Sequence, residues 1–97
     1  MKTLDEIKDI LAQYKTELRQ RYKVKEIGIF GSYVTGGQGK RSDVDILVEF
    51  EEPIGLFQFI ALERYLTELL AAKADLVMKT SLKPRIGRHI LEEVVYI

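Results

Sequence analysis

The chain has 97 residues, 46% of them hydrophobic, which is enough to bury one modest core and too little for a second domain. Lysine plus arginine and aspartate plus glutamate both count 15, so a formal net charge of zero gives no whole-molecule attraction to nucleic acid or membrane. There is no cysteine and one histidine, His89, which excludes disulfides, thiolate metal sites and histidine-rich zinc sites. Carboxylates are the metal ligands that remain.

The N-terminal segment MKTLDEIKDI is charged and amphipathic rather than apolar. No uninterrupted apolar run approaches the ~20 residues that a membrane span needs. We therefore expect a single domain over residues 1–97, a cytoplasmic location and no membrane contact.

The first half of the chain is expected to form a helix, a strand and a glycine-rich loop. Thr3 and Glu6 form a capping-box pattern ahead of a helix over residues 4–21. Its apolar stripe is Leu4, Ile7, Leu11, Tyr14 and Leu18. A strand over 24–30 ends at Gly31, and the glycines at 36, 37 and 39 allow 32–42 at most one short helical turn before an irregular loop. That loop is where we expect the ligand.

The middle of the chain predicts a second strand and a long helix. Val44, Ile46, Val48 and Phe50 alternate with Asp43, Asp45, Leu47 and Glu49. Asp43 and Asp45 should therefore project to the same side. The helix spans about 54–72, with an apolar arc of Leu56, Phe59, Ile60, Leu66 and Leu70. Phe57 and Tyr65 fall outside this arc. They indicate either a partner surface or packing under the N-terminal helix.

A third strand over 74–79 places Asp75, Val77 and Lys79 on one face. Ser81 can cap a last helix that tolerates Pro84 in its first turn and ends near Glu93, with Ile86, Ile90 and Leu91 facing inward. Residues 94–97 form a tail or a short strand. The order α-β-(α)-β-α-β-α predicts an α/β (α+β) fold with a small mixed sheet of about three strands flanked by helices.

The most informative pattern is Gly31-Ser32 after one strand, ten residues, and then Asp43-x-Asp45 at the next strand. A glycine at a strand end lets backbone N–H groups approach an anion, and the serine adds a hydroxyl donor. Two carboxylates at i and i+2 converge, and a hard cation such as magnesium relieves their repulsion. Chance would produce this pattern in roughly one chain per several hundred. The alternative is a plain turn followed by solvated charges that protect a sheet edge.

This pattern resembles the nucleotidyltransferase superfamily, typified by polymerase beta and kanamycin nucleotidyltransferase, and most of all its minimal (MNT) branch. The resemblance spans nearly the whole chain, from the Gly-Ser turn through 42–46 and 74–77 to the tail at 82–93. It implies the nucleotidyltransferase fold, with Gly31, Ser32 and Ser42 binding the nucleotide. It also implies that Asp43, Asp45 and Asp75 are catalytic and hold Mg²⁺. Taken alone, an aspartate at the start of a strand, such as Asp75, is ordinarily a polar residue near a turn.

The resemblance further implies a partner and a donor. Such MNT proteins are commonly the antitoxin of a HEPN-domain toxin, and some transfer AMP from ATP to a tyrosine of that toxin. Two rival functions are a non-enzymatic antitoxin that acts by binding, and transfer to a small-molecule or RNA hydroxyl.

The chain departs from its resemblance in one respect. Many relatives carry arginines shortly after Gly-Ser, whereas this chain has Tyr33, Val34 and Thr35. Lys40 and Arg41 are candidates to replace the missing charges, and solvated loop charges are the alternative reading of this pair.

Other candidate motifs are weaker. The basic residues Lys79, Lys83, Arg85 and Arg88 have no interleaved aromatics, so a solvated helix face fits them better than an RNA site. His89 has no catalytic partner in view and is expected to be structural.

Overall fold

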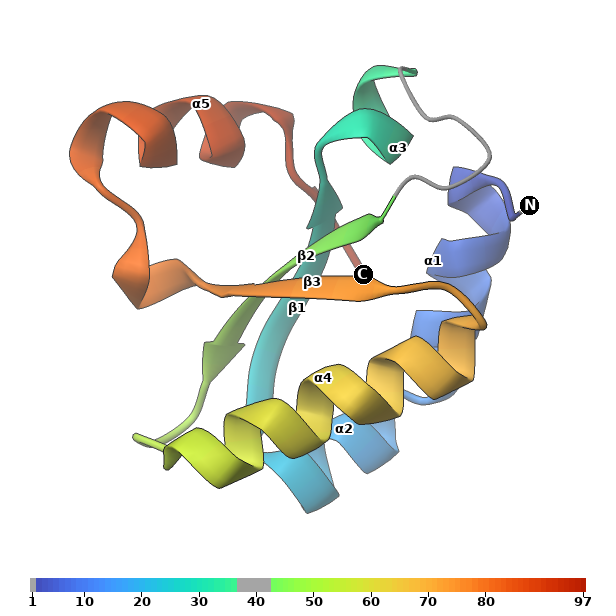
Figure 1. The fold of residues 1–97 in the computed structure, drawn as a ribbon, viewed down its shortest axis with the longest axis vertical. Coiled ribbons are helices and arrows are strands. Elements are labelled where there is room, and N and C mark those ends of the chain that lie inside the picture. Colours follow the sequence, from blue (N-terminus) through green and yellow to red (C-terminus); the bar gives the residue numbers. More distant parts are fainter. Residues whose placement is uncertain (1, 37–42) are drawn as a thin grey trace.

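The computed structural model describes residues 2–36 and 43–97, and its centre is one mixed four-stranded sheet (Figure 1). The strand order is β3-β2-β1-β4. β1 is antiparallel to both β2 and β4, whereas β2 and β3 are parallel. The strands are β1 (Val24–Phe30), β2 (Val44–Phe50), β3 (Ala74–Met78) and β4 (Val95–Tyr96). The mixed α/β fold is confirmed, with one strand more than expected because residues 95–96 pair with β1.

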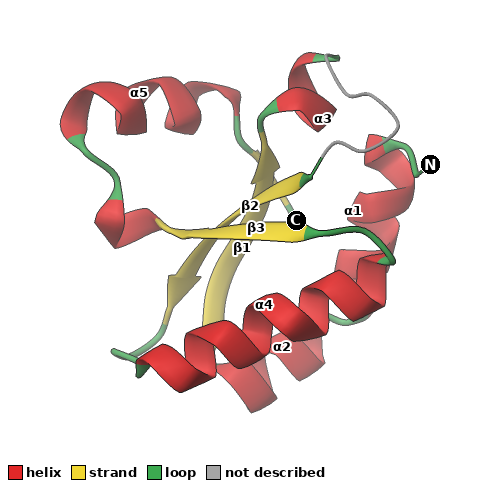
Figure 2. Ribbon diagram, viewed as in Figure 1, coloured by secondary structure: helices red, strands yellow, loops and turns green. Residues whose placement is uncertain are grey.

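Three helices pack on one face of this sheet and enclose the core (Figure 2). They are α1 (Leu4–Gln13), α2 (Lys15–Tyr22) and α4 (Leu56–Leu70). Inward residues of β2 alternate with the outward Asp45, as the sequence predicts. The fully buried side chains shared between helices and sheet include Ile7, Leu11, Leu18, Ile29, Val44, Ile46, Leu62, Leu66 and Leu70.

The N-terminal segment is two helices rather than the single helix expected over 4–21. Tyr14 breaks it, with φ −103° and ψ 12° outside the helical range. Leu11 and Leu18 are still both fully buried, so the apolar stripe continues across the break and hides it from the sequence. The capping box is confirmed: the Glu6 N–H donates to Thr3 Oγ1 at 3.2 Å, and the Thr3 N–H donates to Glu6 Oε1 at 3.1 Å.

The helix expected over 54–72 is shorter, and two residues of its predicted apolar arc face solvent. Leu56 is 69% exposed and Ile60 is 45% exposed. The residues that face the sheet are Phe59, Leu62, Leu66 and Leu70, at helical spacing. Leu56 is the first residue of α4 and Ile60 lies one turn on from it, so both lie beside the face that meets the core.

The C-terminal third departs further from expectation. β3 ends at Met78, and Lys79 begins a short 3₁₀ turn, η1 (Lys79–Ser81), instead of continuing the strand. The last helix, α5 (Pro84–Glu93), has Lys83 as its N-cap rather than Ser81, and Pro84 occupies the first position, where its missing N–H costs nothing.

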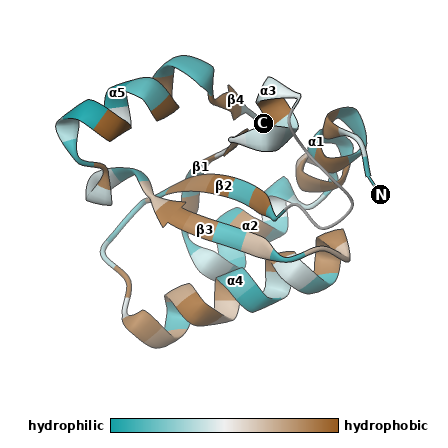
Figure 3. Ribbon diagram, turned by 45° about the horizontal axis from the view of Figure 1, so that its top comes forward, coloured by the Kyte–Doolittle hydropathy of each residue, from teal (hydrophilic) through white to brown (hydrophobic). Residues whose placement is uncertain are grey.

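α5 lies on the other side of the strands from α2 and α4 (Figure 2), which explains a wrong burial prediction. Ile86 is 62% exposed and Leu91 is also exposed, whereas Ile90 is half-buried. Apolar and polar residues alternate along this helix (Figure 3). α5 packs closely against Leu82 at Gly87, because a Cβ at residue 87 would lie only 2.8 Å from Leu82 Cβ. His89 is exposed, as expected of a surface residue. Within the described helices none is long and apolar enough to cross a membrane.

Candidate active site

Asp45 and Asp75 lie side by side on neighbouring strands. The parallel register of β2 and β3 pairs Asp45 with Asp75, and the antiparallel register of β1 and β2 pairs Asp45 with Phe30, the last residue of β1. Two of the three predicted carboxylates therefore lie next to each other at the end of the sheet where β1 stops and the Gly31-Ser32 turn begins. Asp45 is half-buried there and Asp75 is exposed.

Burial and neighbouring acids raise the pKa of the Asp45 carboxyl above its ordinary value. Desolvation is the largest cause, followed by the negative charges of Asp75, Asp43 and Glu93 and a hydrogen bond with Asp75. A group of acids held together in this way is unfavourable unless a proton or a cation shares it. The site thus concentrates negative charge where a metal cation would be stabilised.

Asp43 stands just before β2 and turns partly toward a lysine. Its Oδ2 lies 4.0 Å from Lys73 Nζ, and the next residue, Val44, donates its N–H to the Lys73 carbonyl at 2.8 Å. In residues 2–36 and 43–97, no three histidine or acidic side chains are close enough together to hold a metal ion. The donor chemistry nevertheless fits magnesium, because Asp43, Asp45 and Asp75 offer only carboxylate oxygens.

Gly31 forms a turn that only glycine adopts readily. Its φ of 76° and ψ of −149° lie in a region closed to residues with a Cβ. A Cβ here would lie 2.9 Å from Asp45 Cγ and closer still to Asp45 Oδ2. The Gly31 carbonyl accepts hydrogen bonds from Val34 N–H and Thr35 N–H, both at 3.0 Å, which start the short helix α3 (Ser32–Thr35). The backbone of the Gly-Ser turn is thereby brought against the carboxylate of Asp45.

Glu93 is a residue of the site that the sequence analysis did not single out. Its Oε1 accepts the Gly31 N–H at 3.1 Å, although the two residues are 62 positions apart. Its charge also contributes to the raised pKa of Asp45. The sequence held one signal for Glu93, the apolar pair Val94-Val95, which could form a strand. If that strand paired with β1, Glu93 would lie beside Gly31. Ser42, Lys40 and Arg41 lie outside the described residues.

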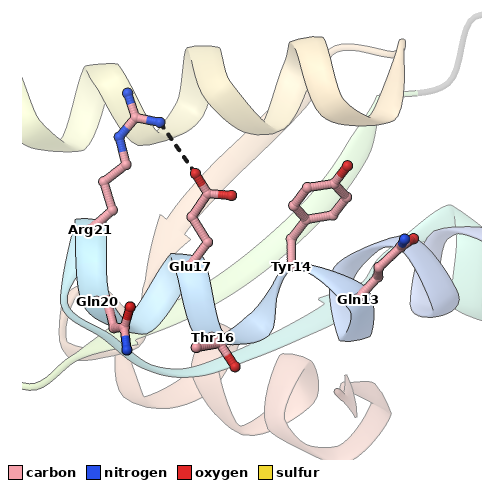
Figure 4. A pocket seen from close by; sticks show the side chains of 6 residues that line it. All are labelled: Gln13, Tyr14, Thr16, Glu17, Gln20 and Arg21. Atoms are coloured by element: carbon pink, nitrogen blue, oxygen red, sulfur yellow. Dashed lines mark hydrogen bonds and ion pairs between the residues drawn. The ribbon is translucent and has the colours of Figure 1, made fainter.

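A separate hollow of about 670 Å³ lies at the junction of α1 and α2 (Figure 4). None of the predicted site residues lines it. Glu17 is already engaged there, since it pairs with Arg21 at 3.4 Å and accepts the Tyr65 hydroxyl at 2.9 Å. The lining residues are Gln13, Tyr14, Thr16, Glu17, Gln20 and Arg21. We assign the chemistry to the carboxylates instead.

Asp45→Asn is expected to stabilise the metal-free protein at pH 7. Because the folded state raises the Asp45 pKa, its ionised form penalises folding above that pKa, and the penalty disappears as the pH falls below the ordinary value near 3.8. The screened repulsion of adjacent like charges suggests a gain of about 0.5 kcal/mol. This gain corresponds to a rise in Tm of about 2–4 °C. Thermal unfolding in EDTA measures it, and the gain in Tm over the wild type should be smaller at pH 4 than at pH 7.

Asp9→Asn is the matched control, because Asp9 is an exposed acid on α1. It should leave Tm unchanged. An Asp45→Asn protein that is no more stable than the wild type at pH 7 would show that the carboxylates do not repel one another in the folded state.

Comparisons with known proteins identify the family of the chain. The nucleotidyltransferase domain family matches residues 11–97. The protein adenylyltransferase MntA of Thermococcus cleftensis is 57% identical over 97 residues, covering 100% of this chain and 98% of that protein. A solved structure provisionally described as a minimal nucleotidyltransferase is 30% identical, with a TM-score of 0.74 over 92% of this chain and 93% of that chain.

A further solved structure shares the fold. It holds a tri-AMPylated HEPN toxin of Shewanella oneidensis in complex with an MNT antitoxin, at a TM-score of 0.66 and 20% identity over 93% of this chain and 70% of that chain. The family match over most of the chain and the high identity to MntA go together with the paired aspartates beside the Gly-Ser turn. The chain therefore belongs to the nucleotidyltransferase domain family and is an enzyme of that class.

Proposed function

We propose that this nucleotidyltransferase is a magnesium-dependent protein adenylyltransferase that moves AMP from ATP to a tyrosine hydroxyl of a HEPN-domain toxin. The observation that carries the proposal is the register pairing of Asp45 with Asp75 beside the Gly31 backbone. The name of the 57% identical relative and the AMP-bearing toxin in the structural neighbour support the same acceptor class.

Each predicted site residue has a role in this proposal. Gly31 and Ser32 receive the triphosphate at the N-terminus of α3, and Ser42 joins them in binding the nucleotide. Asp43, Asp45 and Asp75 hold the magnesium, which when bound neutralises charge on the phosphate oxygens. Asp75, exposed on the edge strand β3, accepts the proton of the attacking hydroxyl. The hydroxyl oxygen bonds to the α-phosphorus while the bond to pyrophosphate breaks.

The two aromatic residues of α4 that fell outside its apolar arc have different environments. Tyr65 packs on Tyr22, with ring centroids 5.2 Å apart, and burial together with its bond to Glu17 raises the pKa of Tyr65 to about 12. It belongs to the packing under α2. Phe57 is 88% exposed and lies near the exposed Leu56 and Ile60. We assign the contact with the toxin to this second group, because neighbouring exposed apolar residues favour association.

Phe57→Ser is expected to weaken the complex with the toxin by about fivefold or more, because a buried aromatic anchor contributes more than about 1 kcal/mol to binding. Isothermal titration of the two purified proteins measures the effect. Ile86→Ser on α5 is the matched control, since Ile86 is also exposed and lies on the opposite side of the sheet. Equal affinities for Phe57→Ser and the wild type would move the docking surface elsewhere.

The transfer itself is tested by incubating the protein with magnesium, ATP labelled at the α-phosphate and a purified HEPN-domain toxin. We expect label on a toxin tyrosine, and none when EDTA replaces magnesium. Label that appears only on a small molecule or RNA would contradict the protein acceptor. Toxin that is neutralised without any label would contradict transfer as the means of neutralisation.

A further inference from the structure

Glu93 closes the Gly-Ser turn from the C-terminal end of the chain. β4 pairs with β1 through Tyr96 opposite Gly28 and Val95 opposite Ile29. If this register continued for two more residues, Glu93 would stand opposite Gly31. Glu93 is instead the last residue of α5, and its side-chain oxygen supplies the acceptor that a strand carbonyl would have offered to the Gly31 N–H.

The position of this acid is unfavourable for the helix that carries it. The C-terminus of a helix bears partial negative charge, so a carboxylate in the last turn is destabilising. Glu93 is also close enough to Asp45 to raise that residue's pKa, so its charge opposes the charge of the site. Among the described residues, the Glu93 side chain accepts a hydrogen bond from the Gly31 N–H, and this contact offsets part of that cost.

Gly31 needs such a restraint because its backbone conformation is rarely populated. Its carbonyl is held by α3 through Val34 and Thr35, and its N–H is held by Glu93. Conformations of this kind persist where the surroundings fix them on both sides. The bond to Glu93 restrains the peptide that enters Gly31, and the bonds from α3 restrain the peptide that leaves it toward Ser32.

We propose that Glu93 is a positioning residue for nucleotide binding, and that it acts as a hydrogen-bond acceptor on the Gly31 amide rather than through its charge. The proposal rests on the proposed function, because it assigns the turn to the triphosphate. The α5–β4 segment thereby becomes part of the active site, although it supplies no residue that touches the reacting atoms.

Three substitutions separate the acceptor from the charge. Glu93→Gln keeps the length and an acceptor oxygen but removes the charge. Glu93→Asp keeps the charge but shortens the reach, and Glu93→Ala removes both. Glu92→Ala is the matched control, because Glu92 is the exposed neighbour on the same helix.

The first readout is hydrogen exchange of the Gly31 amide, measured by NMR on each full-length variant without nucleotide. We expect about tenfold faster exchange in Glu93→Ala and Glu93→Asp, because the side-chain hydrogen bond to the Gly31 N–H is lost. Glu93→Gln and Glu92→Ala should stay within about threefold of the wild type. The β1 amides provide the internal reference for global unfolding.

The second readout is the steady-state transfer of AMP. Glu93→Ala and Glu93→Asp should raise KM for ATP by about tenfold and change kcat less, whereas Glu93→Gln should restore KM. Wild-type behaviour of Glu93→Asp together with loss in Glu93→Gln would overturn the proposal, as would unchanged Gly31 exchange in Glu93→Ala. If the wild type transfers no AMP, the proposed function fails, and Gly31 exchange still decides the role of Glu93.

Discussion

Asp43→Asn and Asp45→Asn are each expected to lower AMP transfer to the toxin by about 10³-fold or more. Each change replaces a charged oxygen with a neutral amide at the position proposed for magnesium. Metal-assisted stabilisation of transferring phosphoryl oxygens is worth several kcal/mol, and every 1.4 kcal/mol is about tenfold in rate. The measurement is the initial rate of label transfer from α-labelled ATP, repeated over a range of magnesium concentrations.

The two aspartates should differ in their effect on stability. Asp45 is half-buried among acids, so its loss should stabilise the metal-free fold, whereas Asp43 pairs with Lys73 at the surface and its loss should be nearly neutral. Asp9→Asn controls for loss of an acid outside the site and should keep the full rate. Wild-type labelling by either site variant would remove that aspartate from the proposed metal site.

Gly31→Ala is expected to cost both folding and activity. The added Cβ would meet the Asp45 carboxylate, and the backbone conformation of Gly31 costs a residue with a Cβ about 1–3 kcal/mol. Either Asp45 moves or the turn opens, and a displacement of about 1 Å at a reacting centre can reduce the rate by about 10²-fold. Urea unfolding and the transfer assay measure the two effects separately.

Gly36→Ala is the matched control for this change. Gly36 also has positive φ, at 87°, but no described atom lies within 4 Å of the Cβ it would gain. It should cost about 1 kcal/mol of stability through backbone strain alone and leave transfer within a few fold. If the two alanine variants lose activity equally, strain in the loop accounts for the loss and contact with Asp45 does not.

The boundaries of β1 and β2 were predictable because short local patterns in the sequence mark where each strand begins and ends. β1 is a β-rich run followed directly by a glycine, and β2 has an apolar residue at every second position. The break at Tyr14 gave no such signal, because burial on both sides of it keeps the helical spacing. The exposure of Ile86 and Leu91 was missed for a different reason. An amphipathic pattern shows that a helix has an apolar face, but it does not show whether that face is covered.

The carboxylates were predictable one by one, but their meeting was not. Asp45 and Asp75 lie on strands joined by α4, and their alignment depends on a parallel register that no local pattern specifies. Glu93 was less visible still, since an acid at a helix end normally indicates a solvated surface. Its place in the site depends on the pairing of β4 with β1, which brings together residues 62 positions apart.

The position of β3 at the end of the strand order has a consequence for how the enzyme chooses its acceptor. Asp75 stands on the rim of the sheet and is open to solvent. If the acceptor is the protein tyrosine proposed above, it can approach Asp75 from the side of the sheet on which β3 lies. Selectivity then depends less on the shape of a binding cavity than on how two protein surfaces align before the hydroxyl arrives.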